Sequence, residues 1–328
     1  MPFSEIVGHE KQLASLSWAL EKDRLHHAYL FLGPEGVGKR TVARSLAMAV
    51  QCREEASDSC GGCVSCVRIR SGNHPDVRVV EPAVGKKEIT IHQVRELERD
   101  LNYRAFVGRR KIAVVDPASL MNLSAQNALL KTLEEPPKDS LLILLSTSAG
   151  GLLPTLVSRC LRLSFAPLPS EIVASFLVTR RGLPREEAEL LAAVSMGSLG
   201  RAVHPEMEEL ARKRKAWAEK IASLTPTDCR GWIGLAEEFA SEREESLKFL
   251  EWVEGWYRDI LIYAVTGSNR GISNLDMEKD IKAQAEGYSL ERTLFLFSQA
   301  GRTAASIRRN FNRRMALEGF FAHVVGLH

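Results

Sequence analysis

The chain has 328 residues, 45% of them hydrophobic, which is enough to bury the cores of two or three domains. Its 44 Lys and Arg residues nearly balance its 41 Asp and Glu residues, and a formal net charge of +3 is too small to indicate nucleic-acid binding by the molecule as a whole. The first ten residues lack the pattern of a secretory signal, and no apolar run is long enough to span a membrane, so we expect a cytoplasmic protein.

A phosphate-binding loop is the first feature along the chain. The apolar run Ala28–Leu32 predicts a buried strand, which leads through Gly33-Pro34-Glu35-Gly36-Val37-Gly38-Lys39 into a segment of helical period. Two glycines five residues apart, followed by lysine, match a P-loop, whose backbone N–H groups surround phosphate oxygens. A plain strand-to-helix turn without a ligand is the alternative interpretation.

The residue after the P-loop lysine departs from the pattern. A P-loop carries Ser or Thr there because the hydroxyl binds magnesium, whereas this chain has Arg40 and places Thr41 one residue later. Since a helix turns about 100° per residue, Thr41 should point elsewhere. We therefore expect weak binding of ATP or ADP, or none, at a degenerate site formed by Gly33, Gly36, Gly38, Lys39, Arg40 and Thr41.

Four cysteines follow the predicted P-loop helix, with the spacing C-x7-C-x2-C-x2-C. Zinc prefers four thiolates in a tetrahedron, and short spacings with two glycines between them let successive sulfurs converge on one ion. Four free thiols in one short polar segment are the less favoured alternative. We predict a structural zinc ion that stiffens an insertion too small for its own core. Its ligands would be Cys52, Cys60, Cys63 and Cys66.

Further apolar runs alternate with helix-length segments. We predict strands at 77–80, 111–115 and 141–145, with a helix at 91–101 between the first two. Strands that alternate with helices indicate a parallel sheet covered on both faces, hence an α/β fold of the Rossmann-like kind. Directly after the predicted strand 111–115, Asp116 could help to hold a metal ion. The next residue is Pro117, which has no carboxylate to position or deprotonate a water.

The alternation stops near residue 165, and the chain beyond it has helical periodicity. Ser170 is the expected N-cap of the first of these helices, with Glu171 just inside. We predict three domains: a nucleotide-binding-like domain over 1–165 with a zinc module at 52–66, a small helical domain over 166–205, and a helical bundle over 206–328. Trp252, Trp256 and Tyr257 suit either the core of that bundle or an interface.

Several motifs together resemble the clamp-loader ATPases, which are of the AAA+ type. The resemblance is carried by the P-loop, the cysteine spacing, Asn73-His74-Pro75-Asp76 and the run VVDPASLMNLSAQNALLKTLEEPP at 114–137. A strand with a first sensor position at Thr147 and the triplet Ser158-Arg159-Cys160 follow. The likeness covers about the first 205 residues. It implies an AAA+ ATPase domain, a helical lid and a C-terminal collar that joins subunits.

The resemblance also assigns roles to single residues. In the family the Ser-Arg-Cys arginine reaches the ATP of a neighbouring subunit, which makes Arg159 an arginine finger that acts in trans; an ordinary exposed arginine is the alternative. Gly197-Ser198-Leu199-Gly200-Arg201-Ala202 resembles the second sensor motif, so Arg201 would face this chain's own nucleotide or form an ion pair. Gln93 and Arg95 are candidate contacts to DNA phosphates.

We therefore predict a stator subunit of a hetero-oligomeric clamp loader, which loads a sliding clamp without hydrolysing ATP itself. Its partners would be gamma- or tau-type ATPase subunits, a delta subunit, the sliding clamp and primed DNA, and its cofactors Zn²⁺ and, weakly, ATP or ADP. A hydrolysing gamma- or tau-type subunit is one alternative, which Arg40 and Pro117 disfavour. A zinc-dependent DNA-binding protein on an ATPase-like scaffold is another, disfavoured by the near-neutral charge.

Overall fold

The structure is a computed structural model that describes residues 1–327, apart from the side chains of Glu206 and Glu208. The chain forms two compact units, which are described separately below. The first unit comprises Met1–Gly182 together with Gly197–Arg201. The second comprises Leu183–Met196 and the chain from Ala202 onward.

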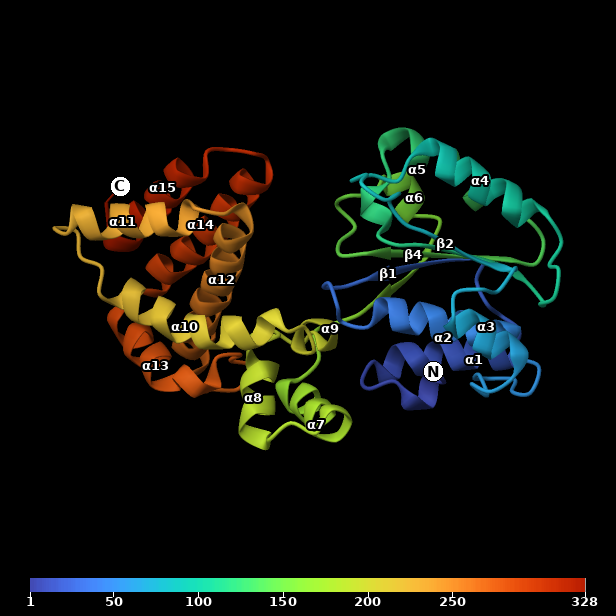
Figure 1. The fold of residues 1–328 in the computed structure, drawn as a ribbon, viewed down its shortest axis with the longest axis horizontal. Helices are drawn as coiled ribbons and strands as arrows, with labels where there is room; N and C mark the ends of the chain where they lie inside the picture. The colour runs from blue at the N-terminus through green and yellow to red at the C-terminus, as the bar shows by residue number, and fades with distance from the viewer. Residues whose placement is uncertain (328) are drawn as a thin grey trace. The chain divides into compact units, whose positions relative to one another are not determined.

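A five-stranded parallel sheet forms the centre of the first unit (Figure 1). Its strands follow the spatial order β2-β3-β4-β1-β5, and every neighbouring pair is parallel. The four predicted strands are present, and a fifth that was not predicted closes one edge. The strands are β1 (Ala28–Leu32), β2 (Val77–Val80), β3 (Lys111–Val115), β4 (Ser140–Ser146) and β5 (Leu161–Ser164).

Helices cover both faces of this sheet, as the continuous apolar strands require (Figure 1). One face carries α1 (Glu10–Glu21), α2 (Lys39–Gln51) and α3 (Val64–Arg70); the other carries α4 (Ile91–Asn102), α5 (Leu123–Glu134) and α6 (Pro154–Val157). Successive strand residues alternate between the two cores. Phe31 and Ile143 belong to the first core, whereas Leu30 and Leu144 belong to the second.

Two helix starts in this unit can be compared with their predictions. The predicted helix at 91–101 is confirmed as α4, and it begins with a capping box in which Thr90 and Gln93 satisfy each other's backbone N–H groups. The predicted N-cap at Ser170 is wrong by one residue. Ser170 is the first residue of α7 (Ser170–Arg181), and Pro169 takes the N-cap position without a side-chain hydrogen bond.

The remaining elements of the first unit are short. They are the 3₁₀ helices η1 (Phe3–Glu5) and η2 (Ala118–Leu120), together with most of α9 (Leu199–Ala202).

The second unit is helical, in agreement with the predicted bundle. Its core is an aromatic cluster in which Phe239 stacks on Phe249 with ring centroids 3.9 Å apart, and Trp217 meets Phe249 edge-on. Trp252, which was open to two interpretations, is buried in the core, as are Trp256 and Tyr257. The elements are α8 (Arg185–Val194), α10 (Glu206–Ala222), α11 (Cys229–Ala240), α12 (Arg243–Thr266), η3 (Leu275–Met277), α13 (Glu278–Gly287), α14 (Leu290–Arg308) and α15 (Arg313–Val325).

The predicted three-domain division stays a prediction. The two-unit division assigns α7 to the first unit and α8 to the second, so it passes through the segment expected to form the small helical domain. No helix within residues 1–327 has both the length and the apolar character that crossing a bilayer requires.

Candidate functional site

The P-loop lies at the carboxyl end of β1 and leads directly into α2. Gly38 is the N-cap of α2 with φ 117°, and Lys39 is the first helical residue. Gly36 has φ 70°, and a Cβ at this position would collide with the hydroxyl of Ser198. The loop therefore depends on glycine both for its backbone conformation and for close packing against a neighbouring segment.

That neighbouring segment is the predicted second sensor motif, Gly197–Arg201. The Gly200 N–H donates to the Gly36 carbonyl at 2.9 Å, and the Ser198 hydroxyl donates to the Glu35 carbonyl at 2.9 Å. The backbone N–H of Arg201 in turn donates to the Ser198 hydroxyl at 3.2 Å. The structure thus brings Arg201 next to the P-loop, and its two predicted roles both stay open.

Lys39 is held by the loop itself. The side chain is buried, and its ammonium group donates hydrogen bonds to the carbonyl oxygens of Gly33 and Pro34, the latter at 2.7 Å. Burial lowers the pKa of Lys39, although Asp116 opposes this shift. A phosphate group that binds Lys39 has to replace these two carbonyl bonds, which weakens its net binding energy.

Arg40 supplies a positive charge where a P-loop enzyme would have magnesium. Its guanidinium lies 2.5 Å from a carboxylate oxygen of Glu81, after β2, and 3.7 Å from one of Asp116, after β3. Burial raises the pKa of Asp116, and the nearby Arg40 counteracts that shift. Glu81 was not predicted. The signal for it was its position directly after a strand, because the carboxyl ends of parallel strands share one edge of the sheet.

The other predicted nucleotide-site residues add no carboxylate. Thr41 is the third residue of α2 and half-buried. Pro117 follows Asp116 at the end of β3, and Thr147 is exposed directly after β4. Proline at this point offers no group that can deprotonate a water or bind a metal. The P-loop therefore keeps the lysine that meets phosphate in related loops, but the residues around it lack the usual side chains for hydrolysis.

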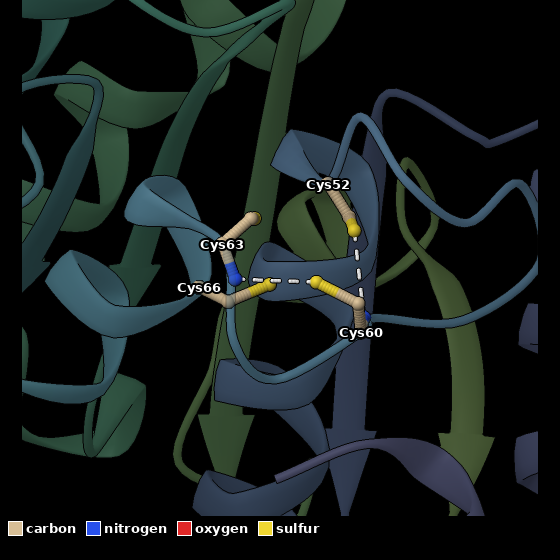
Figure 2. A group of neighbouring side chains, drawn as sticks. All are labelled: Cys52, Cys60, Cys63 and Cys66. Atoms are coloured by element: carbon tan, nitrogen blue, oxygen red, sulfur yellow. Dashed lines mark hydrogen bonds between the residues drawn. The ribbon is translucent and has the colours of Figure 1, made fainter.

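The four cysteines come together as predicted (Figure 2). Cys52 directly follows α2 as its C-cap, Cys63 precedes α3 and Cys66 lies within it, and all four sulfur atoms lie within 4.8 Å of one another. The Cys60 N–H points to the sulfur of Cys52 at 3.4 Å.

The donor set fits a metal such as zinc. Cys52 and Cys66 are buried, and burial next to Cys63 raises the pKa of the Cys66 thiol. Four thiols at such distances match a closed tetrahedral site, in which no position is left for a water. The cluster can therefore bind a structural metal ion; the side chains that would hold it are those drawn in Figure 2.

Arg159 lies on the short connection between α6 and β5. Its guanidinium is 2.7 Å from a carboxylate oxygen of Glu134, the last residue of α5, and it donates to the Thr155 carbonyl at 2.9 Å. The side chain is 36% exposed, whereas the next residue, Cys160, is buried, and burial raises the pKa of its thiol to about 12. Glu134 was not predicted as part of the site, although it belongs to the LEEPP segment that carried the resemblance.

The Asn-His-Pro-Asp signature has a structural role in this fold. Asp76 is buried, and its carboxylate accepts hydrogen bonds from the backbone N–H groups of Phe106, Val107 and Gly108 while it pairs with Lys111 at 2.9 Å. Burial alone would raise the pKa of Asp76, but these donors outweigh it and hold the pKa well below its usual range. The signature therefore anchors the loop before β3.

The two candidate DNA contacts differ in their surroundings. Gln93 is used within the fold, because its side chain accepts the Thr90 N–H and donates to the Glu81 carbonyl. Arg95 is exposed on α4. A role in DNA binding stays a prediction for both.

Comparisons with known proteins indicate the family of the chain. Residues 8–169 match the family model described as DNA polymerase III, delta subunit. The chain is 35% identical to the DNA polymerase III subunit delta′ of Pseudomonas aeruginosa, over 92% of either chain, and 28% identical to that of Bacillus subtilis, over 94% of this chain and 92% of the relative. The match to subunit tau/gamma of Haemophilus influenzae, at 35% identity, covers 60% of this chain and 29% of that protein.

Among solved structures, the chain is similar to a DNA polymerase III gamma-subunit-related protein from Thermotoga maritima. It is 18% identical, with a TM-score of 0.39 over 96% of this chain and 98% of that chain. The sheet, the P-loop and the sequence relatives define an AAA+ protein of the clamp-loader class. The agreement with delta′ subunits extends over almost the full length of both chains. The chain belongs to the family of DNA polymerase III delta′ subunits.

Proposed function

We propose that this delta′-family chain is a stator of the clamp loader, which binds nucleotide weakly or not at all and completes the ATP site of a neighbouring subunit. The observation that carries the proposal is the position of Arg40. Its guanidinium forms ion pairs with Asp116 and Glu81, the carboxylates at the strand ends where a hydrolysing subunit needs magnesium. A site built in this way supports no turnover of its own.

Arg159 is the group that this chain offers to a neighbour. A guanidinium at the γ-phosphate stabilises charge in the transition state, and arginine fingers accelerate hydrolysis about 10³- to 10⁵-fold. Arg159 suits this role because it is half-exposed on a short connection, where one ion pair with Glu134 holds it. The neighbour would be a gamma- or tau-type ATPase subunit, in an assembly that includes a delta subunit and acts in the cytoplasm on a sliding clamp and primed DNA.

The cysteine cluster has a supporting role in this proposal. We assign it one zinc ion, held by Cys52, Cys60, Cys63 and Cys66, that fixes the segment between α2 and β2. When bound, zinc would contribute structure and no chemistry. Arg95 is proposed to contact DNA phosphates from the exposed side of α4.

The test is hydrolysis of ATP by the assembled complex. Arg159→Ala should lower hydrolysis at the neighbouring site by at least about tenfold, and so remove that site's share of the rate of the reconstituted assembly. Arg162→Ala removes an exposed arginine from β5 and should leave the rate unchanged. Equal rates for the wild-type assembly and the Arg159 variant would rule out the role in trans.

A further inference from the structure

A basic pocket in the second unit lies apart from every site described above. Its cavity measures about 370 Å³, within the size range of small-ligand sites. It forms where the end of α11, the start of α12, the end of α14 and the start of α15 meet, and α11 packs against α15 as α12 does against α14. Its polar and aromatic lining consists of Arg243, Asn310, Phe311, Asn312, Arg313 and Arg314.

Two arginines of the lining are held by backbone carbonyl groups. Arg243, on α12, donates from one terminal nitrogen to the carbonyl of Arg308 at the end of α14, at 2.8 Å. Arg313, on α15, donates from one terminal nitrogen to the carbonyl of Ser241 before α12, at 3.4 Å. Each guanidinium has five N–H groups, so each is held in place through one nitrogen and can bind an anion through the others.

The charge of the pocket is not balanced from within. Arg314 forms ion pairs with Glu318 at 2.8 Å and Glu237 at 3.2 Å. Arg243 and Arg313 are held by carbonyl oxygens instead. Among the residues that the structure describes, no Asp or Glu lines the cavity. The lining thus presents two positively charged groups toward whatever enters.

An aromatic ring lies beside these charges. Phe311 lines the pocket and is 55% exposed, between Asn310 and Asn312. The Asn312 side chain caps α15 by accepting the Met315 N–H, which fixes the start of the helix that carries Arg313. An exposed aromatic ring beside two guanidinium groups suits the binding of single-stranded nucleic acid. Bases stack on such a ring, while the cations bind phosphates.

We propose that this pocket binds a nucleotide unit of single-stranded DNA. Arg243 and Arg313 hold the phosphate, and the base stacks on Phe311. The proposal deepens the proposed function and rests on it for the nature of the substrate, since it places a contact to the unpaired part of a primed template on the second unit. An acidic peptide would use the same cations, but it would leave the exposed ring without a stacking partner.

The first test measures binding of a fluorescent oligothymidylate to the full chain by anisotropy at several salt concentrations. The double variant Arg243→Gln, Arg313→Gln should bind at least about fivefold more weakly, and the slope of log affinity against log salt should fall by about 0.7, because the two arginines share one phosphate. The control pair Arg185→Gln, Arg270→Gln removes two exposed charges elsewhere in the second unit and should leave the slope unchanged.

The second test separates stacking from charge. Phe311→Ala should weaken binding by about tenfold without changing the salt slope, whereas Phe311→Trp should restore it. Phe311 is exposed, so neither change disturbs the core. An unaltered affinity in the alanine variant, or equal losses in the two arginine pairs, would overturn the proposal.

Competition identifies the ligand. Displacement of the oligonucleotide by unlabelled strand, and not by a polyglutamate peptide, supports single-stranded DNA. Displacement by the peptide alone, or by free dTMP as effectively as by the strand, overturns it. The pocket variants should leave ATP hydrolysis by the assembly dependent on Arg159, so failure of this inference is distinguishable from failure of the proposed function.

Discussion

At the scale of single residues, Arg40 determines what the nucleotide site can bind. The variant Arg40→Thr removes the guanidinium from Glu81 and Asp116 and introduces the hydroxyl that a P-loop uses for magnesium. We expect ATP affinity to rise by about tenfold and to become dependent on Mg²⁺, with no hydrolysis, because Pro117 is unchanged. Calorimetric titration with and without magnesium measures this.

A matched control uses the same helix. Arg44 is exposed on α2, so Arg44→Thr makes the same substitution away from the carboxylates. It should leave nucleotide binding as it is in the wild-type chain. If both variants changed affinity alike, the Arg40–Asp116 pair would not be what limits binding.

Asp76 gives the first unit a dependence on pH. Its pKa is depressed in the folded chain, so the stability that it contributes is complete above the ordinary aspartate pKa of about 3.9 and is lost as the pH falls toward the folded value. Asp76→Asn should lower the free energy of unfolding by about 3 kcal/mol at pH 7, because it leaves Lys111 unpaired.

Urea unfolding at a series of pH values measures this difference. The gap between wild type and Asp76→Asn should narrow as the pH falls from 5 toward 3. Asp280→Asn, at an exposed position on α13, should change the free energy of unfolding little at any pH. A gap of constant size would mean that the carboxylate charge contributes nothing.

The defect in the P-loop could be predicted from the sequence, because each position of a P-loop requires a particular residue type. The absence of a hydroxyl after Lys39 follows from position alone. The ion pairs of Arg40 with Glu81 and of Arg159 with Glu134 could not be predicted, because they join residues 41 and 25 positions apart whose distance only the fold determines. The hydrogen bond from the buried Arg214 to Asn274, at 3.0 Å, could not be predicted for the same reason.

At the scale of elements, the zinc module is the part whose structure depends most on a ligand. The segment between α2 and β2 contains only the seven-residue helix α3, too short to be stable alone. We expect about one zinc ion per purified chain, and a strong loss of zinc in Cys63→Ser. Elemental analysis measures this, and Cys229→Ser, at an exposed cysteine outside the cluster, is the control.

Removal of the metal should also expose the module to proteases. After treatment with a strong chelator, trypsin should cleave faster at Arg68 and Arg70 on α3, while the strands stay protected. Resistance at these sites in the metal-free chain would show that packing alone maintains the module.

Elements with strong patterns were predicted well, whereas the edge strand β5 was not. β1 and β4 are continuous apolar runs at the centre of the sheet, and α4 carries a capping box at its start. β5 was missed because it has four residues, three of them exposed, and lies at an edge, where a strand needs little apolar character.

At the scale of the whole molecule, the two units have separate cores, which predicts that they respond separately to loss of zinc. Four of the five tryptophans, Trp217, Trp232, Trp252 and Trp256, belong to the second unit, and Trp18 to the first. Trp18 is 53% exposed, so Trp18→Phe should be tolerated. In that variant fluorescence reports the second unit alone, whereas circular dichroism reports both.

Chelation of zinc from the Trp18→Phe chain should lower the urea midpoint of part of the circular dichroism signal and leave the fluorescence midpoint unchanged. The reason is linkage: a ligand that binds only the folded first unit stabilises that unit and no other. If both signals instead moved together to one lower midpoint, the units would unfold as a single cooperative body. The stability of the second unit would then depend on the cysteine cluster, although no residue of that unit belongs to it.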